Sequence, residues 1–399
     1  MADPPTAPPM PHADSARLHG LDSLRALAIL LVFAHHYQLF VSREPTFGWM
    51  SVLGWTGVDL FFVLSGYLIA NPLLKGLTGG QTLSFGRFYA RRLMRTLPCF
   101  YVVLAAYVLL PGQLGGREPP PLWRFLSFTQ NIGLQPGTAF SHAWSLCVEE
   151  QFYLLLPLTL WALLRLRRWQ TWAWLGIAGL TAAAVAWRSW LWQRHGLEAG
   201  NAVADYHPNL YYASLARMDE FLPGVALALL KNTRPQAWAA LMRRGQVLLL
   251  AGLAACALMG FALLRGYYIE GYGYGHAMTA WGYSAVAWSF ALLVAAALSP
   301  RCGLHRLRIP GAASLALWSY AIYLSHKAVG FVWLKPLHTL GIAPGSAAAL
   351  VLVGGSCLLL GWALYRFVER PMLVLRDRLW PDHFAPGCPR APGHATSPA

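Results

Sequence analysis

The stretch LDSLRALAILLVFAHHYQ, from Leu21 to Gln38, is about as long and as apolar as a membrane-spanning helix needs to be. It nevertheless carries Arg25 near one end and the pair His35 and His36 near the other. A charged group at the centre of a spanning helix costs about 2.5 to 3.5 kcal/mol, so such residues are seldom kept without a use. This stretch therefore predicts a membrane fold and a role for its polar residues.

The composition of the whole chain agrees with a membrane fold. Of the 399 residues, 56% are hydrophobic and 12% are charged, whereas about 25% of the residues in soluble globular proteins are charged. The formal net charge of +15 does not indicate nucleic-acid binding, because the basic residues lie between long apolar runs, as they do in loops beside a bilayer. The scattered cysteines show no zinc-ligand spacing, so we expect neither a disulfide framework nor a metal.

Apolar segments of nearly bilayer-spanning length recur along the chain. They predict an all-α integral membrane protein with a bundle of about ten transmembrane helices. The segments are 21–41, 53–74, 97–111, 144–164, 170–190, 213–230, 246–264, 277–298, 313–334 and 345–365.

Most of the 31 Lys and Arg residues fall in one alternating set of connections. This set comprises the N-terminal tail, 75–96, 165–169, 231–245, 301–311 and the C-terminal tail. Because short cytoplasmic loops accumulate Lys and Arg, both termini are predicted to be cytoplasmic. We expect a disordered cytoplasmic tail at 1–20, one membrane domain at 21–371, and a largely disordered cytoplasmic tail at 372–399. With no appended soluble domain in view, function is expected in the bundle and its loops.

The polar residues inside the predicted spans fall at similar depths. Arg25 and His36 are eleven residues apart, which places them on one helix face with a rise of about 16 Å between them. Counting inward from the outer end of each span puts side chains from four further helices near the depth of His36. These side chains are Asp59, Glu149, Glu150, Arg217, His326 and Lys327. Such a layer is either a structural ion-pair network or a functional site.

A second polar cluster lies in the predicted cytoplasmic stretch SFGRFYARRLMRTLP, residues 84–98. Arg87, Arg91 and Arg95 repeat every four residues, so they form one stripe on a helix, with Arg92 beside it. This stripe either contacts lipid phosphate at the membrane surface or cradles a phosphorylated cofactor, because guanidinium groups bind phosphate well.

Six stretches resemble, in this order, motifs of the integral-membrane family called acyltransferase type 3. They are LDSLRALAILLVFAHH, GVDLFFVLSGYLI, RFYARRLMRTLP, AWSLCVEEQFYLLLP, SYAIYLSHKAV and YRFVERPM. The resemblance covers most of 21–371 and implies a ten-helix core in the bacterial inner membrane. It also implies an O-acyltransferase that moves an acyl group, most often acetyl from cytoplasmic acetyl-CoA, to a hydroxyl of a cell-envelope glycan or of another product such as a macrolide. Membrane lipids, this acceptor and envelope-biosynthesis proteins are the implied partners.

The resemblance also assigns individual residues. The Arg-(ten residues)-His motif of the family falls on Arg25 and His36. The WSL..EE.FY motif falls on Trp144, Ser145, Leu146, Glu149, Glu150, Phe152 and Tyr153, and the arginine-rich motif falls on Arg91, Arg92 and Arg95. Where relatives usually have SLYLWHWP, this chain keeps Tyr323 and His326 but has Ser325 and Lys327.

Acyl transfer to an alcohol needs a base and a group that stabilises the oxyanion. We expect His36 to be the base, with a carboxylate from Glu149, Glu150 or Asp59 holding its tautomer. Arg25, with Arg91, Arg92 and Arg95, is expected to bind the acyl-CoA donor. The candidates for binding the acceptor are Trp144, Ser145, Arg217, Tyr323, His326 and Lys327.

Three alternatives stay open. An acyl-enzyme intermediate on Ser65, Ser145, Ser325 or a histidine would replace direct transfer. A proton-coupled transporter of a polar metabolite would also use intramembrane carboxylates and histidines, although the chain shows no inverted repeat. A scaffold for envelope assembly would leave Arg25 and His36 without a role.

Overall fold

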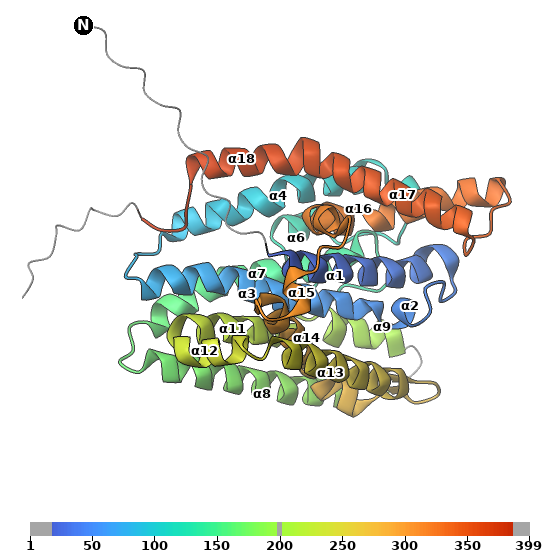
Figure 1. The fold of residues 1–399 in the computed structure, drawn as a ribbon. Coiled ribbons are helices and arrows are strands. Elements are labelled where there is room, and N and C mark those ends of the chain that lie inside the picture. The colour runs from blue at the N-terminus through green and yellow to red at the C-terminus, as the bar shows by residue number, and fades with distance from the viewer. Residues whose placement is uncertain (1–17, 198–201, 386–399) are drawn as a thin grey trace, which may run out of the picture.

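The structure is a computed structural model that describes residues 18–197 and 202–385. Within these ranges long helices lie side by side in a bundle (Figure 1), and the β-structure in named strands is one short antiparallel pair. In this pair, β1 (Tyr268–Ile269) and β2 (Gly273–Tyr274) place Tyr268 opposite Tyr274. The predicted all-α class is confirmed.

Long helices form the body of the bundle. They are α1 (His19–Tyr37), α3 (Gly57–Thr78), α4 (Phe85–Leu109), α7 (Trp144–Leu163), α8 (Trp169–His195), α11 (Leu222–Thr233), α13 (Gly245–Gly266), α14 (Tyr283–Leu298), α16 (Ala312–Thr339) and α17 (Ala347–Leu364). Shorter helices connect or extend them. They are α2 (Trp49–Leu53), α5 (Pro111–Leu114), α6 (Leu122–Leu126), α9 (Ala202–Tyr206), α10 (Ser214–Arg217), α12 (Pro235–Met242), α15 (Gly303–Arg306) and α18 (Arg370–Leu379).

Every predicted span overlaps a helix or a run of helices, but the helices differ in hydropathy. Among the described residues, 7 helical stretches are long and apolar enough to cross a membrane. The predicted segments 170–190, 213–230 and 313–334 overlap α8, the α10–α11 run and α16, which are not among these 7. The last of these helices carries Ser325, His326 and Lys327, which lower its mean hydropathy.

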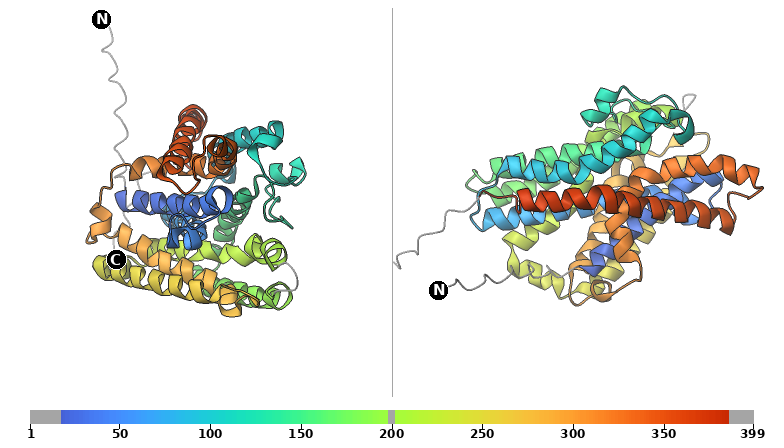
Figure 2. Two further views of the ribbon diagram at one scale, coloured as in Figure 1. Left: turned by 90° about the vertical axis from the view of Figure 1, so that its right-hand side faces the viewer. Right: turned by 90° about the horizontal axis from the view of Figure 1, so that it is seen from above.

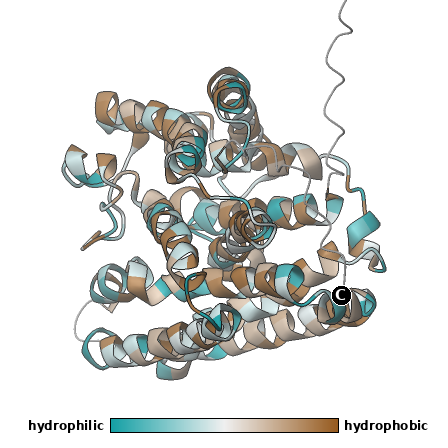
Figure 3. Cartoon of the chain, turned by 90° about the vertical axis from the view of Figure 1, so that its left-hand side faces the viewer, coloured by the Kyte–Doolittle hydropathy of each residue, from teal (hydrophilic) through white to brown (hydrophobic). Residues whose placement is uncertain are grey.

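Apolar side chains cover the outside of the bundle. Figure 3 shows hydrophobic residues spread over its helices. The side chains of Leu250, Leu258 and Phe261 on α13 and of Val351 and Leu359 on α17 are exposed. An apolar surface of this extent is unfavourable in water and suits contact with lipid chains. The multi-pass membrane character predicted from the composition is thus supported by the fold.

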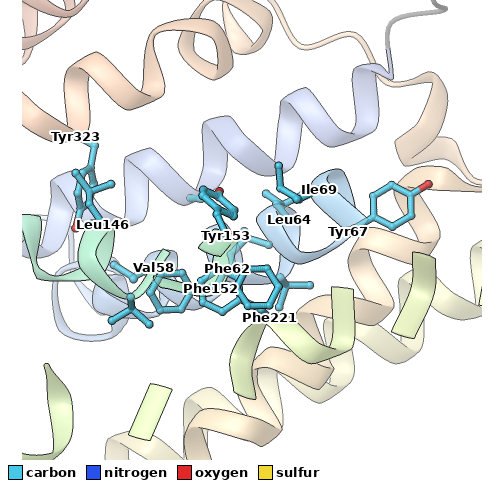
Figure 4. Close-up of a cluster of buried hydrophobic side chains, with 14 of the residues drawn as sticks. Val58, Phe62, Leu64, Tyr67, Ile69, Leu146, Phe152, Tyr153, Phe221 and Tyr323 are labelled. Atoms are coloured by element: carbon cyan, nitrogen blue, oxygen red, sulfur yellow. The ribbon is translucent and has the colours of Figure 1, made fainter. Parts of the chain in front are cut away.

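Aromatic and glycine packing joins the inner helices. Figure 4 shows Phe62, Phe152 and Phe221 stacked at the centre of the bundle; the ring centroid of Phe221 lies 4.4 Å from that of Phe62 and 4.2 Å from that of Phe152. Close by, α3 and α11 approach through two glycines: a Cβ on Gly66 would lie 2.2 Å from the Phe221 carbonyl oxygen, and a Cβ on Gly224 would lie 2.1 Å from the Val63 carbonyl oxygen. These contacts fix the position of α3 at the core of the bundle.

The start of the segment expected to be a disordered C-terminal tail is helical instead. After α17 a π-helical turn, Tyr365–Glu369, leads directly into α18, which continues to Leu379. This last helix lies beside α4 (Figure 2), where ion pairs hold it. Beyond it, Leu83 and Phe384 form an isolated β-bridge. The predicted tail segments 1–17 and 386–399 lie outside the described residues.

Candidate active site

A cavity of about 210 Å³ lies between α1, α3, α4, α7 and α16. At one end it is lined by Arg25, Arg92 and Arg95, and at the other by Ser145 and Tyr323. Its wall between these ends includes Ser65, Glu149 and Tyr153 as well as apolar side chains. The cavity therefore joins residues that the sequence assigned separately to donor binding, to the carboxylate role and to acceptor binding.

The arginines of α4 divide into two groups. Arg92 faces the cavity, and its guanidinium carbon lies 4.2 Å from the ring centroid of Tyr153. The predicted stripe instead meets acidic residues of the C-terminal segment. The pairs are Arg87 with Asp382 at 3.6 Å, Arg91 with Asp377 at 3.1 Å and Arg95 with Glu369 at 2.8 Å.

Arg91 is thus not brought to the cavity with the other predicted donor-binding residues. Its guanidinium pairs with Asp377 and also donates to the Trp380 carbonyl oxygen. The stripe predicted from the spacing of four residues exists, but the chain itself neutralises it. Arg92, one position off the stripe, and Arg25 from α1 supply the cavity's cationic end; Arg95 also lines this end, although it is paired with Glu369.

His383, which follows α18, has a pKa that is affected by these arginines. Burial lowers the pKa of His383 to about 4, and the positive charges of Arg91, Arg92 and Arg376 act in the same direction. His383 is therefore neutral near pH 7 and adds no positive charge to this region.

Glu149 is held in the cavity wall by two hydroxyl groups. Ser65 from α3 and Tyr153, one turn further along α7, both donate to its Oε1 atom. The neighbouring Glu150 does not line the cavity, since the two residues point about 100° apart on α7. Of the two adjacent glutamates, the structure brings only Glu149 to the cavity.

At the opposite end of the cavity, a hydrogen-bonded chain links α16 to the start of α7. The Tyr323 hydroxyl donates to the His142 carbonyl oxygen at 2.5 Å, so Ser145 Oγ, 2.6 Å away, donates to Tyr323. The ring of His142 in turn lies 5.1 Å from that of His326 and 6.1 Å from that of His36, between centroids. His142 was not among the residues predicted from the sequence, where its one signal is its place directly before the AWSL motif.

His36 contacts a histidine rather than the carboxylate predicted for it. Its Nδ1 atom lies 2.6 Å from Nε2 of His326, and the two rings are 20° from parallel with centroids 4.8 Å apart. Within the described residues no carboxylate is hydrogen-bonded to His36. The candidate carboxylates have other partners: Glu149 is bound to Ser65 and Tyr153, and Asp59 is bound to Arg217.

The hydrogen bonds fix the tautomers of this pair. His326 Nδ1 lies 3.1 Å from the Ile322 carbonyl oxygen, which can only accept, so the proton of neutral His326 is on Nδ1. Its Nε2 atom then accepts from His36 Nδ1. Neutral His36 is left with a bare Nε2 lone pair, which is the form that a general base requires.

Lys327 is buried next to this pair. Its Nζ atom donates to the Thr138 carbonyl oxygen at 2.8 Å and to Ser141 Oγ at 3.0 Å. It lines a small second cavity together with His36 and His326. The structure thus brings together three of the polar residues that the sequence placed in one layer.

Arg217 belongs to a separate, fully buried network. Its guanidinium pairs with Asp59 at 3.1 Å and also with Glu220, and it lies 5.1 Å from the ring centroid of Trp144. Asp59, Arg217 and Trp144 therefore lie away from the histidine pair and do not line the cavity. The expectation that Asp59 serves His36, or that Arg217 and Trp144 bind the acceptor, finds no support in these contacts.

A second buried ion pair escaped the sequence analysis. Arg188 lies in α8 with no exposed surface, and its guanidinium lies 2.7 Å from the Asp219 carboxylate and 2.5 Å from Ser284 Oγ. The signal in the sequence was the adjacent pair Asp219 and Glu220. Asp219 forms an ion pair with Arg188, and Glu220 forms one with Arg217.

The family is settled by the length of chain that matches it. A profile described as "Acyltransferase domain", for the type 3 family, matches residues 18–366. The chain belongs to this acyltransferase family. The resemblance seen in the six motifs is confirmed, and the enzyme is an acyltransferase.

Two relatives share part of the sequence of this acyltransferase. It is 31% identical over 226 residues to the peptidoglycan O-acetyltransferase OatA of Listeria monocytogenes, a match that covers 52% of this chain and 33% of the relative. It is 35% identical over 158 residues to YrhL of Bacillus subtilis, named provisionally as a peptidoglycan O-acetyltransferase, covering 35% of this chain and 23% of the relative. The chain therefore spans a third or less of the length of these relatives.

No solved structure matches the acyltransferase significantly. In the described part of the chain, no group of three or more His, Cys, Asp and Glu residues is arranged to hold a metal ion. The transporter and scaffold alternatives gain no support from the comparisons, whereas the acyltransferase class does.

We expect Arg217→Met to destabilise the fold strongly. The substitution leaves Asp59 and Glu220 buried without a cation, and breaking a buried pair in this way costs about 3 to 5 kcal/mol. Thermal unfolding of the purified protein in detergent measures the loss. Arg194→Met, which removes an exposed arginine in α8, is the control and should change stability by less than about 0.5 kcal/mol. Equal melting temperatures for the two variants would contradict a structural role for Arg217.

Proposed function

We propose that this acyltransferase is an O-acyltransferase of the bacterial inner membrane that moves an acetyl group from cytoplasmic acetyl-CoA to a hydroxyl of a cell-envelope carbohydrate. The observation that carries the proposal is the cavity between Arg25, Arg92 and Arg95 at one end and Tyr323 at the other, where the histidine pair begins. A phosphate-binding end and a base-bearing end are what an acyl-CoA transferase needs. The acceptor class follows from the names of the relatives, which are O-acetyltransferases of peptidoglycan.

The proposed orientation places both termini and the arginine end in the cytoplasm, with about ten spans. Its support is that connections from the Lys- and Arg-rich set meet each other. The loop before α4 pairs with the segment after α18 through Leu83 and Phe384, and Gly20 at the start of α1 packs against Leu304 of α15. At the opposite end, the Tyr37 hydroxyl donates to the Pro344 carbonyl oxygen at 2.7 Å. The His36 end of α1 then faces outward.

The cationic end of the cavity fits the phosphates and the pantetheine arm of acetyl-CoA. Guanidinium groups bind phosphate oxygens with two parallel hydrogen bonds, and Arg92 has a buried Nε atom without a partner in the described structure. Arg25 lies eleven residues before His36, about 16 Å along α1. An extended thiol arm entering at the arginines would carry the thioester toward Tyr323.

His36 acts as the general base of the transfer. Its bare Nε2 atom takes the proton of the acceptor hydroxyl while the hydroxyl oxygen attacks the thioester carbon. The C–S bond then breaks, and the CoA thiolate recovers the proton from His36. His326 takes the place proposed for a carboxylate, because it holds the His36 tautomer through Nε2 and is itself held by the Ile322 carbonyl oxygen.

Direct transfer fits the serine contacts better than an acyl-enzyme does. Ser65 Oγ donates to Glu149, Ser145 Oγ donates to Tyr323, and Ser325 Oγ donates to the Ala321 carbonyl oxygen at 2.9 Å. None of these hydroxyls donates to a histidine, which a serine nucleophile would need as its base. Glu149, inside the cavity, has the role of a hydrogen-bond acceptor for the donor arm or for Tyr153.

We expect His36→Ala to lower kcat by at least about 100-fold, because general-base catalysis contributes about 100- to 10,000-fold. The measurement is acetyl-CoA-dependent acetylation of chitooligosaccharide or soluble peptidoglycan fragments by protein in liposomes, followed by mass spectrometry. His35→Ala is the matched control: His35 Nδ1 instead contacts the Ser51 carbonyl oxygen at 2.9 Å, outside the histidine pair. A His36→Ala protein that folds and retains near-normal kcat would rule out this base.

The two adjacent arginines of α4 should differ in their effect on the donor. Arg92→Ala is predicted to raise the KM for acetyl-CoA by about 10-fold or more, since a hydrogen bond to a charged group contributes about 1.5 to 3 kcal/mol. Arg91→Ala should leave this KM within about threefold, because its guanidinium is already paired with Asp377. Initial rates over a range of acetyl-CoA concentrations provide the test. If Arg91→Ala raised the KM as much as Arg92→Ala, the assignment of Arg92 to the donor would fail.

A further inference from the structure

Lys327 is the cation closest to the proposed base, and it is almost fully buried with 1% of its surface exposed. Two of its three N–H donors are used by Thr138 and Ser141. The rings of Phe40 and Phe331 have their centroids 4.9 Å and 5.9 Å from its Nζ atom. One donor remains for another group.

Of the basic side chains that are almost fully buried in the described part of the chain, Arg188 and Arg217 have a carboxylate partner and Lys327 does not. Arg188 is paired with Asp219 and Arg217 with Asp59 and Glu220. In residues 18–197 and 202–385, no carboxylate lies within ion-pair distance of Lys327. A buried charge without a counter-charge is strongly unfavourable. Fixing the loop that holds Thr138 and Ser141 does not require a charge, because an uncharged hydrogen-bond donor could bind both residues equally well.

A small cavity is lined by Lys327 and the histidine pair together. This cavity has a volume of about 10 Å³, near the smallest volume that holds one water. A carboxylate or phosphate group of an acceptor would be too large for it. A single hydroxyl oxygen fits, and it would meet the proposed base and the ammonium together.

We propose that Lys327 is a catalytic residue that stabilises the acceptor oxygen as it becomes an alkoxide. This inference rests on the proposed function. In the step, the acceptor O–H bond breaks and its proton passes to His36 Nε2. The electron pair left on the oxygen forms the new C–O bond with the acetyl carbon, and the C–S bond breaks to give CoA thiolate. The third N–H of Lys327 donates to the oxygen while the negative charge develops, which is where a fixed cation lowers the barrier.

The limits of the donor cavity assign Lys327 to the acceptor rather than to the donor. The donor cavity ends at Ser145 and Tyr323 and does not include Lys327. The loop residues Thr138 and Ser141, which bind Lys327, belong to the connection before α7 that is proposed to face outward. Donor and acceptor would then approach the histidine pair from different sides.

The test compares Lys327→Met, Lys327→Arg and Ser141→Ala in liposomes with acetyl-CoA and chitotriose as the acceptor. Chitotriose carries no anionic group, so an effect of the lysine charge on this acceptor must arise from charge that develops in the reaction. Lys327→Met should lower kcat by about 100-fold or more, with the KM for acetyl-CoA within threefold. Lys327→Arg should recover most of this loss, because it keeps the charge. Ser141→Ala, which removes one anchor but leaves the ammonium, should stay within about threefold of the wild-type kcat.

Several results would overturn the inference. One is a folded Lys327→Met protein with near-normal kcat, and another is a Lys327→Arg protein that folds and is no better than Lys327→Met. If Lys327→Met does not fold, Ser141→Ala and Lys327→Arg decide: a loss of kcat of about 100-fold in Ser141→Ala, which keeps the ammonium, shows an anchoring role. A Lys327→Arg protein that keeps most of its kcat, with Ser141→Ala within about threefold of wild type, supports the inference. A loss seen only with muramic-acid-containing fragments, and not with chitotriose, shows a site for an acceptor carboxylate. If the wild-type protein acetylates neither chitotriose nor the muramic-acid-containing fragments, the proposed function itself is wrong.

Discussion

A helix bundle surrounded by lipid has to satisfy its buried charges from within, and this constraint separates the structural polar residues from those available for chemistry. Arg188 and Arg217 lie in contact with carboxylates and aromatic rings deep in the bundle. Such pairs hold α3, α8, α10 and α14 together, and removing one partner leaves an uncompensated charge. Arg92, His36 and Lys327 each keep a nitrogen available for a further partner, and they lie at the two cavities.

The sequence predicts the helices well because the length of an apolar run is a local property. Each predicted span overlaps a helix, and Arg25 and His36 both lie in α1. Pairing is a tertiary property, and here the prediction fails. The sequence assigned Arg91, Arg92 and Arg95 alike to the donor. In the structure, Asp377 and Glu369 from the C-terminal segment pair with Arg91 and Arg95. The disorder expected after residue 372 was wrong for α18 for the same reason, since the helix is held by these contacts.

The same limitation applies to the carboxylates. Asp59, Glu149 and Glu150 have similar depths, and their sequence positions do not say which of them meets His36. In the structure none of them does, because Asp59 goes to Arg217 and Glu149 to Ser65 and Tyr153. The partner of His36 is His326, from the motif that carries Ser325 and Lys327. A histidine pair held by a backbone carbonyl gives the base its tautomer without adding a negative charge, and the adjacent Lys327 supplies a positive one.

The donor and the acceptor are proposed to reach one membrane-embedded site from opposite sides. Proteoliposomes of uniform orientation provide the test, with labelled acetyl-CoA supplied only on the side of the α4 arginines and chitotriose or soluble peptidoglycan fragments only on the other side. We expect labelled acetyl ester on the acceptor in this arrangement, and none when donor and acceptor are exchanged between the two sides. Transfer that occurs only when both are supplied on the same side would rule out access from opposite sides.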